Sequence, residues 1–102
     1  MFLAEVIGHV VATKKDDHLI GRKLLILRPK LVDDKDNSKF KDGQNTIIAI
    51  DTVGAGVGEF VLFCQGSSAR QAGDLKPVPV DAAVVAIVDC VEVLGKTIYK
   101  TN

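Results

Sequence analysis

The chain has 102 residues, of which 47% are hydrophobic, and its 13 basic residues balance 13 acidic ones. This length gives a single domain with one core, and the apolar content exceeds what so small a core needs, so we expect contact with another chain to bury part of it. A net charge of zero creates no field to gather nucleic acid or an anionic membrane, which argues against both partners.

Neither a membrane span nor an export signal is predicted. The longest uninterrupted apolar run, residues 82–88, is far below the roughly 20 residues that span a bilayer. The N-terminus lacks the basic start and long apolar core of a signal peptide. Cys64 and Cys90 lie in apolar runs without C-x-x-C spacing, as small buried side chains do in a reducing compartment. We therefore expect a soluble, intracellular protein without a disulfide.

The first half of the chain predicts three strands. Residues 2–13 alternate with a period of two and predict a long, half-buried strand. A second strand over residues 23–28 is expected to stop at Pro29, because proline cannot donate to a ladder. Residues 33–43 predict a solvated hairpin loop, and residues 46–51 the third strand.

The second half predicts two more main strands around one short helix. The fourth strand, residues 59–65, is expected to turn Phe60, Leu62 and Cys64 toward the core. Residues 66–73 predict one helical turn, with Ser67 or Ser68 as N-cap and Gly73 as its stop, followed by an extended Lys76–Pro79 segment.

The fifth strand, residues 83–93, is apolar on both faces in its first half. Its outer face is therefore expected to lie under the short helix or under a neighbouring subunit. Residues 97–100 predict a short sixth strand at an edge. Five main strands and one short helix predict an all-β fold, a small OB-like barrel spanning residues 1–102; a β-sandwich is the alternative.

Three glycines, Gly54, Gly56 and Gly58, lie between the third and fourth strands. A dinucleotide fingerprint would need a third glycine where Glu59 stands and a helix after it, and no Gly-Lys-Ser/Thr follows for a phosphate loop. The glycines are better explained by a turn with positive φ or by close approach of another backbone. A metabolite-binding domain that uses the turn as an anion nest is the third and weakest hypothesis.

No catalytic or metal-binding set is predicted. His9 and His18 lack structural-zinc spacing to the cysteines, and the acids of residues 34–38 lack the glycine and glutamate of a calcium loop. The candidate nucleophiles have no base and orienting group in a recognisable arrangement; they are Ser67, Ser68 and Cys64. The sequence thus predicts neither an enzyme nor a cofactor.

Two side-chain patterns leave alternatives open. OB barrels often bind single-stranded nucleic acid by stacking bases on aromatic side chains, which makes such a module the alternative function, although aromatic residues are few here. Arg70 either forms a bidentate pair across an interface or is an ordinary solvated arginine. Its possible carboxylate partners are Asp51, Asp81 and Asp89.

Five stretches, in this order and together spanning nearly the whole chain, resemble the EutN/CcmL family of bacterial microcompartment vertex proteins. They are LAEVIGHVVAT at residues 3–13, Leu24-Leu25, AIDTVGAGVGE at 49–59, GSSAR at 66–70 and PVDAAVVAIVD at 79–89. The chain departs from the family pattern in a longer loop at residues 33–43, and in Phe60, where tryptophan is common.

The resemblance implies an OB-like barrel that assembles as a pentameric ring. Such rings plug the vertices of a polyhedral shell in the bacterial cytoplasm and contact its hexameric tiles, without catalysis or cofactor. The Ser-Ser-Ala-Arg-Gln form favours a catabolic metabolosome over a carboxysome. Closure of five copies head to tail would create curvature that hexagonal tiling lacks.

Seven residues are predicted to lie at subunit interfaces. A side chain at position 56 is expected to clash with a neighbour or with the required backbone angle, and Arg70 is expected to bridge a carboxylate. The set comprises Asp51, Gly54, Gly56, Gly58, Ser67, Ser68 and Arg70.

Overall fold

The computed structural model describes residues 1–71 and 80–101, without the side chains of Ser68 and Arg70. Within these residues the chain forms eight strands and two short 3-10 helices. In chain order they are β1 (Phe2–Val10), η1 (Asp17–Leu19), β2 (Leu24–Val32), β3 (Phe40–Asp42), β4 (Ile47–Asp51), β5 (Phe60–Gln65), η2 (Gly66–Gln71), β6 (Ala82–Ile87), β7 (Cys90–Val93) and β8 (Lys96–Lys100).

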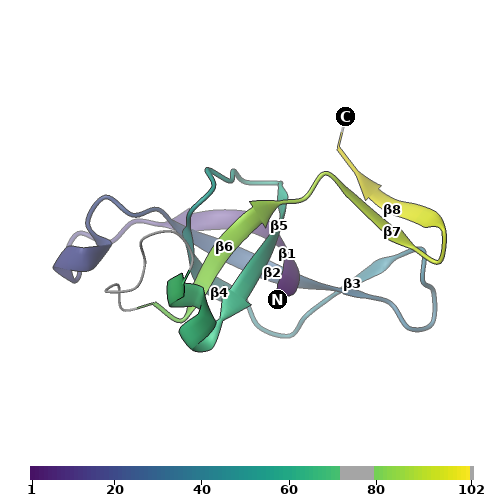
Figure 1. Ribbon diagram of the computed structural model, residues 1–102, viewed down its shortest axis with the longest axis horizontal. Helices are drawn as coiled ribbons and strands as arrows, with labels where there is room; N and C mark the ends of the chain where they lie inside the picture. The colour runs from purple at the N-terminus through teal and green to yellow at the C-terminus, as the bar shows by residue number, and fades with distance from the viewer. Residues whose placement is uncertain (72–79, 102) are drawn as a thin grey trace.

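Five of the strands close into a barrel in the order β1-β5-β6-β4-β2, and pairing of β2 with β1 completes the ring (Figure 1). All of these pairs are antiparallel except β4 with β6, which pair in parallel over Ile50–Ala83 and Asp51–Val84. Closure removes the exposed sheet edges that an open sheet would present. The predicted OB-like barrel is confirmed, and the β-sandwich alternative is wrong.

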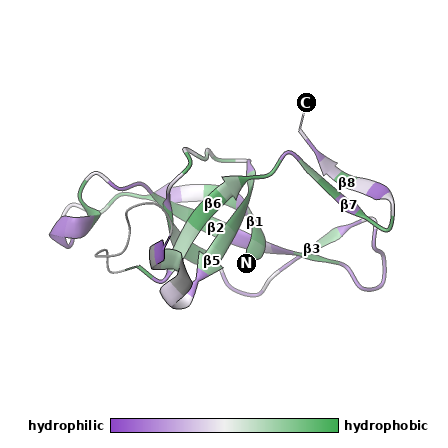
Figure 2. Cartoon of the chain, in the orientation of Figure 1, coloured by the Kyte–Doolittle hydropathy of each residue, from purple (hydrophilic) through white to green (hydrophobic). Residues whose placement is uncertain are grey.

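The barrel is filled by side chains that alternate along its strands, as the period-two pattern predicted. Ala4 and Val6 of β1 are fully buried, and β2, β5 and β6 add further apolar side chains. Figure 2 shows hydrophobic residues concentrated on β5 and β6 and hydrophilic ones on η1. The largest fully buried side chains are Phe63, Leu25, Leu27, Ile50, Val6, Val61 and Val84.

A second, smaller cluster lies between the barrel wall and η2. Ala69 of η2 packs with Ile50 and Ala83, all at most 1% exposed, and half-buried Cys64 packs against them. The short helix therefore covers the outer face of β6 at Ala83, as the first of the two explanations predicted; cover of the rest of that face by a neighbouring subunit stays a prediction. The helix begins at Gly66, before either serine proposed as its N-cap. The predicted stop at Gly73 and the Lys76–Pro79 segment lie outside the described residues.

Pro29 does not end the second strand, so that prediction is wrong. The Pro29 carbonyl accepts a hydrogen bond from the Gly43 amide at 2.8 Å, so the proline nitrogen faces the same side of β2. On that side, pairing with β4 ends at Leu27 and pairing with β3 begins at Lys30. The missing donor thus falls where β2 changes partners, and the strand loses no ladder hydrogen bond.

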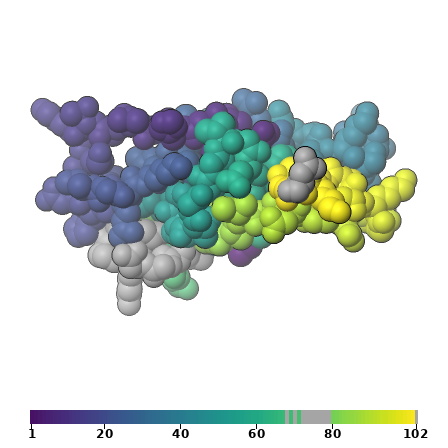
Figure 3. Space-filling model, turned by 90° about the horizontal axis from the view of Figure 1, so that it is seen from above, coloured from purple at the N-terminus to yellow at the C-terminus, as the bar shows by residue number. Residues whose placement is uncertain are grey.

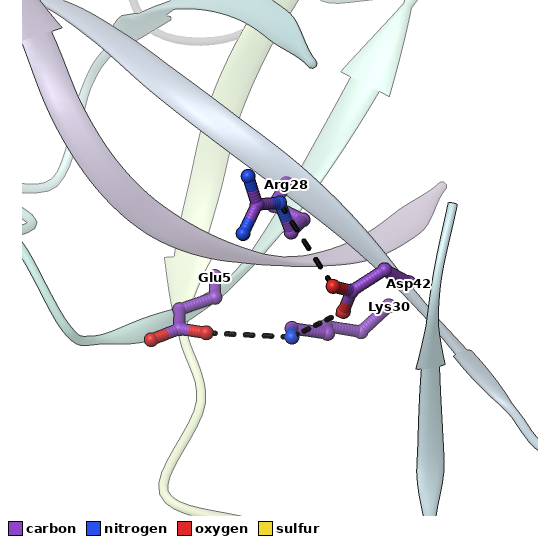
Figure 4. A network of polar contacts seen from close by, with 4 residues as sticks. All are labelled: Glu5, Arg28, Lys30 and Asp42. Atoms are coloured by element: carbon purple, nitrogen blue, oxygen red, sulfur yellow. Dashed lines mark hydrogen bonds and ion pairs between the residues drawn. The ribbon is translucent and has the colours of Figure 1, made fainter. Parts of the chain in front are cut away.

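The predicted loop at residues 33–43 contains β3, which extends β2 beyond the barrel into a ribbon. Lys30 lies between two carboxylates: its Nζ is 2.5 Å from Asp42 Oδ1 and 3.5 Å from Glu5 Oε1 (Figure 4). The hydrogen bond from Lys30 lowers the pKa of Asp42 below its usual value. These contacts link β1, β2 and β3.

The face of β5 is opposite to the one predicted. Val61 and Phe63 point into the core, whereas Phe60 lies on the outside of the barrel. There the Phe60 ring stacks on Tyr99 of β8, with centroids 4.0 Å apart, and also contacts Phe40 of β3 at 5.4 Å. Three of the aromatic side chains that a nucleic-acid module would offer to bases are thus packed against one another.

The predicted fifth strand is divided in two. β6 leaves the barrel at Ile87, and after Val88 and Asp89 the chain forms a separate hairpin of β7 and β8. The Val88 amide donates to the Phe60 carbonyl at 2.8 Å, and the Thr101 amide to the Asp89 carbonyl at 2.9 Å. Figure 3 shows this hairpin, in yellow, lying against the teal part of the barrel. Cys90, at its start, is exposed, so its predicted burial is wrong, and both cysteines are free.

Candidate subunit-contact site

The glycine loop, residues 52–59, is organised by the carboxylate that precedes it. Asp51 Oδ1 accepts hydrogen bonds from the amides of Val53 and Gly54 at 3.0 and 3.1 Å, and Oδ2 accepts from Ala55 at 2.9 Å. A short acidic side chain that caps successive amides stabilises a tight turn in the way that it caps a helix. Asp51 therefore has a structural role within its own chain.

The same loop is fixed to the barrel by its other residues. Ala55 is fully buried in the core cluster, and its carbonyl accepts from Lys23 Nζ at 2.9 Å. The Gly58 amide donates to Val6 at 2.8 Å, and Thr52 Oγ1 donates to Val84 at 2.7 Å. At Gly58, the close backbone approach predicted for the glycines is thus made to the chain's own β1.

The second carboxylate of this region, that of Glu59, also binds an amide of the loop. Its Oε1 accepts from the Gly56 amide at 2.6 Å, and its own amide donates to the Gly56 carbonyl at 3.2 Å. The four successive amides of residues 53–56 therefore already donate to carboxylates of the chain. An anion nest needs such amides to face a ligand, so the metabolite-binding hypothesis gains no support here.

The three glycines meet different constraints. Gly54 and Gly58 have φ of 79° and 91°, a region that side chains rarely adopt, so the predicted constraint on the backbone angle applies to them. Gly56 has no such angle, so the backbone-angle constraint predicted at position 56 is wrong; a Cβ there would lie 3.4 Å from Glu59 Oε1. Val53, Val57 and the glycines at 54 and 58 are exposed and form the outer surface of the loop.

The predicted interface residues do not form one cluster. Asp51 and the glycines lie before β5, whereas Ser67, Ser68 and Arg70 belong to η2, which follows it (Figure 1). Ser67 is exposed, and the η2 backbone is tied to the chain by a 2.7 Å hydrogen bond from the Gly66 amide to the Asp81 carbonyl. The side chains of Ser68 and Arg70 are outside the described part of the chain. A contact between the glycines and the η2 residues across two copies stays a prediction.

The acidic residues of the loops serve local turns. Asp16 accepts from the amide of His18 at 2.9 Å, and hydrogen bonds from this amide and from the His18 ring lower the pKa of Asp16. Asp36 accepts from Ser38 Oγ at 2.5 Å and from its amide, which lowers the pKa of Asp36. In the described residues no three histidine, cysteine or acidic side chains are grouped to hold a metal ion, and no helix there is long and apolar enough to cross a membrane.

One exposed feature of the structure was missed by the sequence analysis. The turn between β7 and β8 is formed by Leu94 and Gly95, and Leu94 is 81% exposed with φ of 51°. The dipeptide lacks the Asn-Gly or Asp-Gly signature of such turns, so only a weak hairpin signal is present in the sequence.

Residues 1–89 match the family model described as ethanolamine utilisation protein EutN/carboxysome. The chain belongs to the EutN/CcmL family. This match ends at Asp89, immediately before the β7–β8 hairpin.

Three relatives illustrate the similarity along nearly the full chain. The microcompartment shell vertex protein GrpN of Rhodospirillum rubrum is 45% identical over 93% of this chain and 100% of GrpN. The carboxysome shell vertex protein CcmL of Nostoc sp. is 46% identical over 97% of this chain and 93% of CcmL. The shell vertex protein EutN of Salmonella typhimurium is 43% identical over 97% of this chain and 94% of EutN.

Two of these relatives have solved structures. That of Nostoc CcmL superimposes with a TM-score of 0.83 over 99% of this chain and 100% of CcmL, at 45% identity. The structure of GrpN, described as a pentameric microcompartment shell protein, superimposes with a TM-score of 0.78. The match covers 92% of this chain and 100% of GrpN, at 44% identity. These relatives are structural shell proteins, which confirms the predicted class and the prediction that the chain is not an enzyme.

Proposed function

We propose that five copies of this chain form a ring that occupies a vertex of a bacterial microcompartment shell in the cytoplasm. The observation that carries this proposal is the similarity, over 92% of this chain, to GrpN, a pentameric shell protein with 44% identity to it. Vertex proteins of both carboxysomes and catabolic compartments are similar to this chain, at 46% and 43% identity for the two compared above. The Ser-Ser-Ala-Arg-Gln stretch favours a catabolic metabolosome.

The ring would bring different surfaces of neighbouring copies together. A cyclic assembly with an odd number of copies uses a heterologous contact, in which one patch meets another patch. We propose that the glycine loop and the η2 residues contribute to these contacts, and that the outer rim of the ring meets the hexameric tiles. The residues we propose for this interface are Asp51, Gly54, Gly56, Gly58, Ser67, Ser68 and Arg70.

Native mass spectrometry of the purified protein tests the proposal. We expect a species of five chains, each of 10.9 kDa, that persists at micromolar concentration. A monomer under these conditions would contradict the vertex function. Gly56→Val and Arg70→Ala then test the interface residues: each should lower the mass or melting temperature of the ring, and if neither variant changes either quantity, the proposed interface is wrong.

A further inference from the structure

The tip of the β7–β8 hairpin is unfavourable for an isolated chain. Leu94 and Gly95 form its two-residue turn, both with positive φ, 51° and 79°. Such a turn favours asparagine, aspartate or glycine in its first position, and Leu94 is the only non-glycine residue with positive φ in the described part of the chain. Its side chain is also 81% exposed. Turn geometry and solvation both disfavour leucine at this position. Its presence therefore needs an explanation outside the isolated chain.

The hairpin presents this leucine in a defined position. The Tyr99 ring of β8 stacks on Phe60 at 4.0 Å, with the ring planes 16° apart. Val88 and Thr101 add backbone hydrogen bonds at the base of the hairpin. In Figure 1 the turn projects at one end of the longest axis, away from the start of β1 near the middle. A strained residue held in this way at a surface is a candidate contact residue.

A hollow of about 370 Å³ on the barrel suits an apolar side chain. It lies between the start of β1, the end of β5 and the link from β3 to β4. Its apolar lining comes from Phe63, Ile47 and Pro29, and Phe2, 49% exposed, forms an aromatic wall. The polar side chains that complete the lining, Asn45 among them, are all amides, so the hollow carries no charge. An uncharged hollow of this kind favours an apolar side chain flanked by peptide groups.

We propose that Leu94 of one copy inserts into this hollow on the next copy of the same chain. An exposed apolar side chain that complements a hollow elsewhere on the molecule makes a heterologous contact, which closes into a ring at the appropriate rotation. Burial of Leu94 offsets the strain of its turn, which explains why leucine stands there. This inference rests on the proposed ring and identifies one of its contacts.

Leu94→Asn provides a test in which two measurements move in opposite directions. Asn-Gly suits the turn, so the dissociated variant should have a higher urea midpoint than the dissociated wild type. Its ring, having lost five buried leucines, should dissociate at a concentration at least roughly tenfold higher. Val11→Asn, at a residue 85% exposed outside the hairpin, is the matched control and should leave dissociation unchanged.

A cross-linking experiment tests the hollow itself. In a Cys90→Ser background, Leu94→Cys combined with Asn45→Cys should give an oxidation ladder up to five chains. Val11→Cys with Asn45→Cys should give none. Cross-links between two Leu94→Cys positions, no ladder in the first pair, or an unchanged dissociation concentration for Leu94→Asn would each overturn the contact while leaving a pentameric wild type intact. A monomeric wild type would overturn the ring and the contact together.

Discussion

Replacing Phe60 with alanine should lower the free energy of unfolding by about 3 kcal/mol, the lower end of the range for aromatic truncation, because Phe60 is only partly buried. The aromatic side chain of Phe60 joins β5 to β8 and β3: it stacks on Tyr99 at 4.0 Å and contacts Phe40 at 5.4 Å. Alanine would remove both contacts at once. Urea denaturation of the dissociated chain, followed by circular dichroism, measures the loss.

The same variant should release the hairpin before the barrel unfolds. Backbone amides of residues 90–100 are expected to lose protection from hydrogen exchange in Phe60→Ala, while those of β1 and β2 keep it. Phe60→Trp is the matched control, since an indole can still stack on Tyr99, and it should retain most of the protection. If the hairpin amides exchanged equally in all three proteins, the stack would not be what attaches the hairpin.

Replacing Asp51 with alanine should cost about 2–3 kcal/mol of unfolding free energy, as expected when a carboxylate acceptor is lost. Three amides donate to it, and the one at Ala55 is partly buried. Without that acceptor the glycine loop should loosen and Ala55 should leave the core. Denaturation midpoints and the exchange rates of the amides of residues 53–55 measure the two effects.

Asp51→Asn separates the role of the two carboxylate oxygens. The amide keeps one oxygen for Val53 and Gly54 but turns a donor toward the Ala55 amide, so we expect about half of the loss seen with alanine. Equal losses for the two variants would mean that the hydrogen bond at Ala55 carries the effect. No loss in either would show that the loop is held by its other contacts, including Lys23.

The sequence predicted the strands of the barrel because their signals are local. Alternation in β1 and the apolar run of β6 determine which residues form strands, whichever strand they pair with. The predictions failed where the neighbouring strand determines the local structure. Pro29 is tolerated because β2 changes neighbours there, and a three-residue strand such as β3 is too short to be distinguished from a loop.

The face of β5 could not be derived from its sequence. Phe60 and Phe63 lie on opposite faces and both faces are apolar, so periodicity does not choose between them. The choice depends on Tyr99, nearly forty positions further along the chain, which covers the outer face. The division of the predicted fifth strand after β6 has the same origin, since the hairpin must turn back to bring Tyr99 onto Phe60.

The candidate site was only partly predictable for a related reason. Its glycines were recognised as a turn, but the acceptors of the loop amides became known only from the fold. The sequence offers Asp51 as one of three possible carboxylate partners of Arg70, which is why it stands among the predicted interface residues. Its observed hydrogen bonds show that it first serves its own loop, and any contact with a second copy would be additional.

The two projections of the barrel differ in how they can transmit force. β2 belongs both to the barrel wall and to the ribbon with β3, without an intervening linker, so a load on the ribbon is carried along a continuous hydrogen-bonded strand. The β7–β8 hairpin is joined to the barrel by two residues outside any strand and by ring contacts. In mechanical terms the ribbon is a continuous extension of the barrel wall, whereas the hairpin is a docked arm whose load passes through the Phe60–Tyr99 stack and the Val88–Phe60 hydrogen bond.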